Sequence, residues 1–108
     1  MIVLRVVLNA SPEKRKELTQ ALSHMISDIR RETTCSQASA HLDLEDENRL
    51  LVLSHWESRE RLDAYLRSEK FSALLGTKIL LRSALLAFID TVAIREGMEA
   101  IMAVRSDC

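Results

Sequence analysis

Residues 55–71, HWESRERLDAYLRSEKF, connect an apolar strand to an amphipathic helical segment and contain the only Trp and the only Tyr of the chain. The strand is Arg49–Trp56, whose length and aliphatic content suit a sheet. Ser58 and Ser68 are placed to cap two short helices in succession. We therefore expect a strand followed by a broken helical crossover, in which Gly76 is a weak point inside the second helix. The apolar residues at helical spacing in this crossover are Leu62, Tyr65, Leu66, Phe71, Leu74, Leu75 and Ile79.

A second strand–helix unit lies at the N-terminus. The run Ile2–Leu8 is β-branched and aliphatic except for Arg5, which predicts a strand. Ser11 is a candidate cap for the helix that follows, and Pro12 suits the first turn of that helix. The buried face of this helix is predicted from apolar residues at three- and four-residue steps, namely Leu18, Ala21, Leu22, Met25, Ile26 and Ile29.

The middle and the end of the chain complete the pattern. Residues Ser36–Leu44 alternate between apolar and polar, and the acidic turn Glu45–Asn48 joins them to Arg49–Trp56 as an antiparallel hairpin. Ala84–Ile94 predicts the last strand. The element order β-α-β-β-α-β is that of the α+β, ferredoxin-like fold with an antiparallel sheet. We expect one domain over residues 1–94 and a C-terminal tail over 95–108, in which a helix can form.

The first strand is apolar on both faces, with Ile2, Leu4, Val6 and Leu8 opposed to Val3 and Val7. Two helical segments cover only one face of a four-stranded sheet, so the other face needs a cover. A second copy packed sheet to sheet would supply it. We therefore predict a homodimer with a barrel-like centre, a dimeric α/β barrel.

Composition excludes several classes of protein. The chain of 108 residues has 15 Lys and Arg against 16 Asp and Glu, so we expect no nucleic-acid partner. No apolar run approaches the ~20 residues that span a bilayer, and no leader is visible, so we expect a cytoplasmic protein with no membrane contact. Cys35 and Cys108 form no CxxC pair, which favours free thiols and no metal site. Phosphate-loop, Ser-His-Asp and paired-carboxylate signatures are absent from the sequence.

Two segments resemble the antibiotic biosynthesis monooxygenase (ABM) family, small dimeric α+β barrel proteins. They are the hairpin 42–49, LDLEDENR, and Trp56-Glu57-Ser58 through Leu66, with Ser68 and Phe71 beyond it. The resemblance covers roughly Ile2 to Ile94. It implies a monooxygenase that oxidises electron-rich aromatic small molecules, such as quinols or polyketide phenols, without a flavin or metal cofactor. An ionised hydroquinone can pass an electron to O2 directly, so the protein need only bind the ring, assist deprotonation and stabilise charge.

The resemblance also implies catalytic residues. Trp56 would stack on the substrate, Tyr65 would offer its hydroxyl, and His41 or Arg5 would handle the proton or the oxyanion. Each residue has a structural interpretation as well, because Trp56 and Tyr65 can be core residues and His41 can form a polar pair across a dimer. Arg5 could instead pair with Asp43 or Asp90.

One departure from the family bears on activity. The Asn that family oxygenases carry four positions before the Trp is replaced here by Val52. Two functions therefore remain open: a cofactor-independent oxygenase with a pocket around Trp56 and Tyr65, and a non-catalytic small-ligand-binding or regulatory dimer of the same fold. A third, isomerisation of a phosphorylated sugar-like molecule, would need a cationic phosphate site, for which Arg5 alone is weak support.

Overall fold

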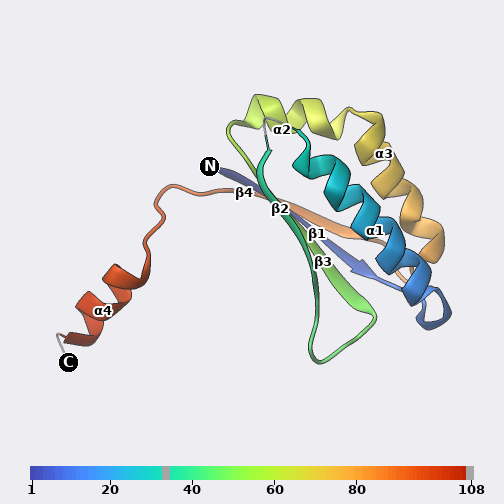
Figure 1. Cartoon of the computed structure of the whole chain (residues 1–108), viewed down its shortest axis with the longest axis horizontal. Helices are drawn as coiled ribbons and strands as arrows, with labels where there is room; N and C mark the ends of the chain where they lie inside the picture. The colour runs from blue at the N-terminus through green and yellow to red at the C-terminus, as the bar shows by residue number, and fades with distance from the viewer. Residues whose placement is uncertain (33–34, 107–108) are drawn as a thin grey trace.

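The computed structural model describes residues 1–32 and 35–106. Four strands form one antiparallel sheet in the order β2-β3-β1-β4. The strands are β1 (Ile2–Asn9), β2 (Cys35–Leu42), β3 (Arg49–Trp56) and β4 (Leu86–Thr91). Helices α1 (Arg15–Arg30), α2 (Arg59–Leu66) and α3 (Glu69–Gly76) lie together on one face of the sheet (Figure 1). The predicted order β-α-β-β-α-β and the α+β, ferredoxin-like fold are confirmed.

The core lies between the sheet and the helices. β1 is one of the two inner strands of the sheet, and its register pairs Val6 with Val52 of β3 and Ala87 of β4. Because side chains alternate along a strand, every second residue of β1 faces the helices. The buried cluster includes those residues together with the predicted apolar face of α1, namely Ile2, Leu4, Val6, Leu8, Leu18, Leu22, Ile26 and Ile29.

The crossover after β3 is broken as the sequence predicts. The Ser58 hydroxyl accepts a hydrogen bond from the backbone N–H of Arg61 at the start of α2. The Ser68 hydroxyl does the same for Phe71 at the start of α3. Helix α3 ends at Gly76, and a 3-10 turn, η2 (Thr77–Leu80), follows it. The two serines therefore fix where each helix begins.

The prediction that the Ser11 side chain caps the first helix is wrong. A 3-10 turn, η1 (Pro12–Lys14), precedes α1, and the backbone carbonyl of Ser11 accepts from the N–H of Lys14. The Ser11 side chain makes no capping hydrogen bond. The tight turn satisfies this orphan N–H with backbone alone, which leaves no need for the hydroxyl.

Two predicted strands are shorter than the sequence suggested. The strand predicted over 84–94 is β4, and it ends at Thr91 because Thr91 pairs with Ile2, where β1 itself begins. The strand predicted over 36–44 is β2, which ends at Leu42. Beyond β4 the predicted tail contains a helix, α4 (Met98–Ser106). Cys35 is a free thiol, whereas Cys108 lies outside the described residues.

The face of the sheet away from α1–α3 is called the open face here. Its apolar residues are Val3, Val7, Leu51, Leu53, Leu86 and Phe88, as the strand register shows. Phe88 is 44% exposed and Leu86 49% exposed in the single chain. The predicted dimer through this face stays a prediction. Within the described residues, no helix is long and apolar enough to cross a membrane.

Candidate functional site

An aromatic stack stands between the end of β3 and the helices. Trp56, the last residue of β3, is 1% exposed, and its indole Nε1–H donates to the Ser54 hydroxyl at 2.9 Å. The ring of Tyr65 from α2 stacks on the Trp56 ring with centroids 4.8 Å apart and planes 25° apart. Phe71 of α3 meets the Tyr65 ring edge to face at 5.5 Å. Three elements therefore hold the Tyr65 ring in one position.

The Tyr65 hydroxyl has unusual protonation chemistry. Burial raises the pKa of Tyr65 to about 12, and Cys35 and Glu32, where they are ionised, act in the same direction. A phenol with this pKa is neutral at physiological pH, so it can donate a hydrogen bond but cannot act as a base. No described residue forms a hydrogen bond with this hydroxyl.

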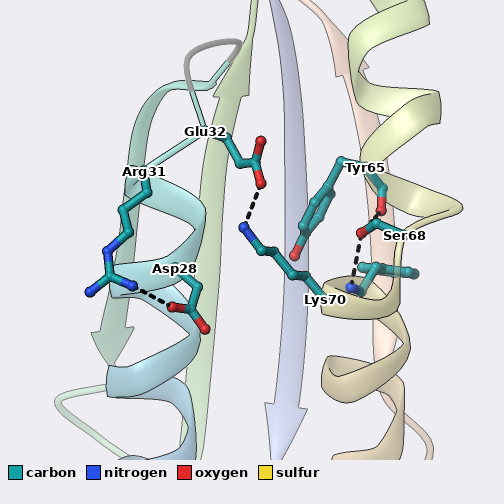
Figure 2. Close-up of polar contacts among 7 residues, drawn as sticks. Asp28, Arg31, Glu32, Tyr65, Ser68 and Lys70 are labelled. Atoms are coloured by element: carbon teal, nitrogen blue, oxygen red, sulfur yellow. Dashed lines mark hydrogen bonds and ion pairs between the residues drawn. The ribbon is translucent and has the colours of Figure 1, made fainter.

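A cavity of about 230 Å³ lies beside Tyr65, between α1 and α3. Figure 2 shows the Tyr65 hydroxyl pointing into the space between these helices, beside the Lys70 side chain. The ammonium of Lys70 bridges this space to the Glu32 carboxylate, with Nζ and Oε1 2.5 Å apart (Figure 2). The cavity is lined by Met25, Asp28 and Ile29 of α1, by Tyr65, and by Glu69, Lys70 and Ala73 of α3.

Arg5 and His41 lie elsewhere, on the open face. The Arg5 guanidinium pairs with Asp90, with Nε and Oδ2 2.7 Å apart, and its Cζ lies 5.1 Å from the centroid of the Phe88 ring. Of the two pairings that the sequence allowed, the one with Asp90 is therefore the one formed. Arg5 and His41 both line a cavity of about 290 Å³ on this face.

The four predicted site residues thus form two pairs on opposite faces of the sheet. Trp56 and Tyr65 stack under the helices, and Arg5 and His41 share the open-face cavity. A catalytic role for any of them stays a prediction. The geometry does not place Arg5 or His41 beside the aromatic stack of the same chain.

Sequence reasoning missed Ser54 and Lys70. Ser54 is 1% exposed. The sequence feature that could have identified it is a polar residue in an apolar strand, two positions before Trp56 and therefore on the same face of the strand. Lys70 is on the surface of α3 and gave no signal in the sequence, because only the packing of α3 beside α1 brings it to Glu32 and Tyr65.

Burial raises the pKa of the Cys35 thiol, which disfavours a nucleophilic thiolate there.

Residues 1–32 and 35–106 contain no group of three or more His, Cys, Asp or Glu side chains that could hold an ion.

Comparisons with known proteins agree with this architecture. The profile of the family described as "Antibiotic biosynthesis monooxygenase" matches residues 1–75. No curated protein matches the chain significantly. Among solved structures, a candidate antibiotic biosynthesis monooxygenase from Deinococcus radiodurans is 22% identical, with 90% of this chain and 97% of that chain covered and a TM-score of 0.82.

Two further structures are similar in fold. Rv0793 from Mycobacterium tuberculosis is 18% identical, with 89% of this chain and 98% of that chain covered and a TM-score of 0.80. A conserved protein from Methanosarcina mazei Go1 is 25% identical, with coverages of 83% and 92% and a TM-score of 0.74. The structural likeness shows the fold, and the profile covers more than half of the sequence. The chain therefore belongs to the antibiotic biosynthesis monooxygenase family.

Proposed function

We propose that this protein is a monooxygenase of small, quinol-like aromatic molecules that uses no cofactor, and that it binds them in the cavity beside Tyr65. The observation that carries this proposal is the Tyr65 hydroxyl, a protonated donor that no described residue engages and that lies on the wall of a cavity. The volume of about 230 Å³ is below the ~300–1,000 Å³ typical of sites for drug-sized ligands. A single aromatic ring fits this size better than a polycyclic phenol.

The cavity offers the groups that an ionising phenol needs. The Tyr65 hydroxyl donates a hydrogen bond to the phenolic oxygen of the substrate. The Lys70 ammonium breaks its ion pair with Glu32 and forms one with the substrate phenolate, which it stabilises. The carboxylate of Glu69 lies on the same wall and can pass the released proton to solvent. The electron-rich anion then gives one electron to O2, and the superoxide and the ring radical combine in a new C–O bond. Loss of water breaks the O–O bond, so that one quinol and one O2 give one hydroxyquinone and one water.

In this proposal Trp56 supports Tyr65 rather than holding the substrate itself. Trp56 is fully buried behind the Tyr65 ring, and its indole N–H is already bonded to Ser54. Val52, at the position of the family Asn, is 3% exposed within the core, so an amide donor is missing there. The donors proposed here, Tyr65 and Lys70, line the cavity between α1 and α3 instead.

Oxygen uptake with a panel of reduced single-ring quinols tests the proposal. The matched variant Tyr65→Phe keeps the stacked ring and removes only the hydroxyl, so we expect catalysed uptake, after subtraction of autoxidation, to fall about 10- to 100-fold. Trp56→Phe should also lower the rate, because Tyr65 loses its stacking surface. Uptake that is equal in wild type and Tyr65→Phe would refute the role of this hydroxyl, and uptake no faster than autoxidation would refute the oxygenase.

A second function, a non-catalytic small-ligand-binding or regulatory dimer, is favoured by the separation of the predicted site residues. The ionisable pair Arg5 and His41 lies across the sheet from the aromatic pair, so the four residues that the sequence predicted for catalysis do not share one cavity of a single chain. Ligand-dependent changes in Trp56 fluorescence without oxygen uptake would identify this function.

We propose further that the open face is covered by a second copy of the chain. Contact with this second copy would bury Phe88 and Leu86 of the open face, which are almost half exposed in one chain. Packing there would also enclose the Arg5–Asp90 pair, whose charges compensate each other and so limit the cost of desolvation.

A further inference from the structure

The charges around the cavity between α1 and α3 do not balance. Two carboxylates, those of Asp28 and Glu69, line the cavity, against one ammonium, that of Lys70. Asp28 pairs with the exposed Arg31 at 3.1 Å and Lys70 pairs with Glu32, whereas Glu69 forms no ion pair with any residue that the structure describes. Three carboxylates therefore face two cations, and the excess charge is negative.

The Lys70 ammonium is already engaged in the free protein. Its ion pair with Glu32 is half-buried, because the two side chains are 45% and 38% exposed. Figure 2 shows this pair spanning the space between α1 and α3, next to the Tyr65 ring. A phenolate that draws Lys70 away leaves the Glu32 carboxylate without its counter-charge, and a partly buried charge that loses its partner is destabilised.

A substrate that carries its own ammonium avoids this cost. Its phenolate takes the Lys70 ammonium, and its ammonium takes the place that Lys70 leaves at Glu32, so one ion pair is exchanged for two. A substrate that carries a carboxylate has the opposite effect, because it adds a negative charge to a site where negative charge is already in excess.

The Tyr65 hydroxyl is an independent sign that a ligand binds between these helices. Tyr65 is only 6% exposed, and its hydroxyl, which points into the space between α1 and α3 (Figure 2), has no hydrogen-bond partner among the described residues. Buried polar groups in proteins are nearly always hydrogen-bonded, so an oxygen of a bound molecule would satisfy this donor. Met25 and Ile29 of α1 supply apolar contacts for a ring.

From these observations we infer that the substrates of this cavity are phenols with a positively charged amine substituent. The ammonium of the substrate binds Glu32, while its phenolic oxygen binds Tyr65 and Lys70. The excess negative charge that Glu69 leaves in the cavity strengthens the preference for a cation. The inference rests on the cavity of the proposed function and names its substrate class, but it does not depend on the reaction with O2.

Equilibrium binding under argon tests the inference with two probes that differ mainly in the charge of their side chain. They are 4-hydroxy-3-nitrophenethylamine and 4-hydroxy-3-nitrophenylacetate, whose nitro group leaves both phenols largely ionised in neutral buffer. The 13C shift of the Met25 methyl group reports binding in the cavity, and the methyl groups of Met98 and Met102 on α4 serve as references. One half-exposed attraction gained and one repulsion removed predict that the amine binds about tenfold more tightly than the acid.

Two matched variants locate the preference. Glu32→Gln keeps the shape of the side chain, removes its charge and frees Lys70 for the acid probe, so we expect the ratio of the two dissociation constants to fall below about threefold. Glu13→Gln removes an exposed carboxylate before the other end of α1 and should keep the tenfold ratio. A ratio near one in the wild type, or an equal ratio in wild type and Glu32→Gln, would overturn the inference.

The outcomes separate this inference from the reaction. If neither probe shifts the Met25 methyl group, or if shifts are confined to Met98 and Met102, the inference fails together with the cavity of the proposed function. Binding at Met25 without a preference for the amine contradicts the inference alone. Because binding is measured without oxygen, oxygen uptake no faster than autoxidation contradicts the reaction alone.

Discussion

Raising the pH through the ionisation of Tyr65 will destabilise the fold. The pKa of Tyr65 is raised to about 12, against about 10 in an unfolded chain, because the buried site disfavours the phenolate. The Tyr65 contribution to stability is therefore fully present below pH 10 and is lost as the pH rises towards 12. The two pKa values give a loss of about 1.4 kcal/mol at pH 11 and about 2.3 kcal/mol at pH 12.

Two assays measure this effect directly. Tyr65 is the only tyrosine of the chain, so the phenolate absorbance reports its ionisation without interference from another tyrosine. Urea unfolding at neutral pH and at pH 11 gives the stability change, and Tyr65→Phe at the same two pH values accounts for all other titrating groups. We expect the loss in wild type to exceed the loss in Tyr65→Phe by about 1.4 kcal/mol. A measured pKa near 10, or equal losses in both proteins, would refute the burial argument and with it the protonated donor in the cavity.

Three other predictions follow from single contacts. Ser54→Ala leaves the indole N–H of Trp56 without its buried acceptor, so the free energy of unfolding in urea should fall by about 1–3 kcal/mol. The control Ser83→Ala changes an exposed serine and should stay within about 0.5 kcal/mol of wild type. Equal losses in the two variants would contradict this prediction. Phe88→Glu charges the open face and should convert the proposed dimer to monomers in light scattering; a dimeric mass that the substitution leaves unchanged would argue for another interface. Ser68→Ala removes the cap of α3 and should cost about 1 kcal/mol in thermal unfolding, which an unchanged melting temperature would contradict.

Local pattern was sufficient for most of the secondary structure. Apolar steps along α1, alternation along β2 and the serines before α2 and α3 each act within a few residues, so their effects are visible in the sequence. The end of β4 was not visible in this way, because it depends on where β1 begins to supply hydrogen-bond partners. The cap at Ser11 failed for a related reason, since the turn η1 satisfied the backbone before the side chain was needed.

The candidate site was less predictable than the fold. The sequence identified Trp56 and Tyr65 as a pair, and the structure stacks them. It grouped Arg5 and His41 with them, although strand alternation and register put these two on the opposite face. Lys70 could not be found at all, because its place beside Tyr65 depends on how α3 packs against α1 and on its ion pair with Glu32, which follows α1.

By itself, then, the sequence determined the element order, the buried faces, the helix starts at Ser58 and Ser68 and the family, because periodicity, capping and short motifs act over a few neighbouring residues. Tertiary structure alone decided which side chains share a cavity, that Arg5 pairs with Asp90 rather than Asp43, and that α4 stands away from the domain. These features join residues up to 85 positions apart, and only the sheet register and the packing of helices on it bring such residues together.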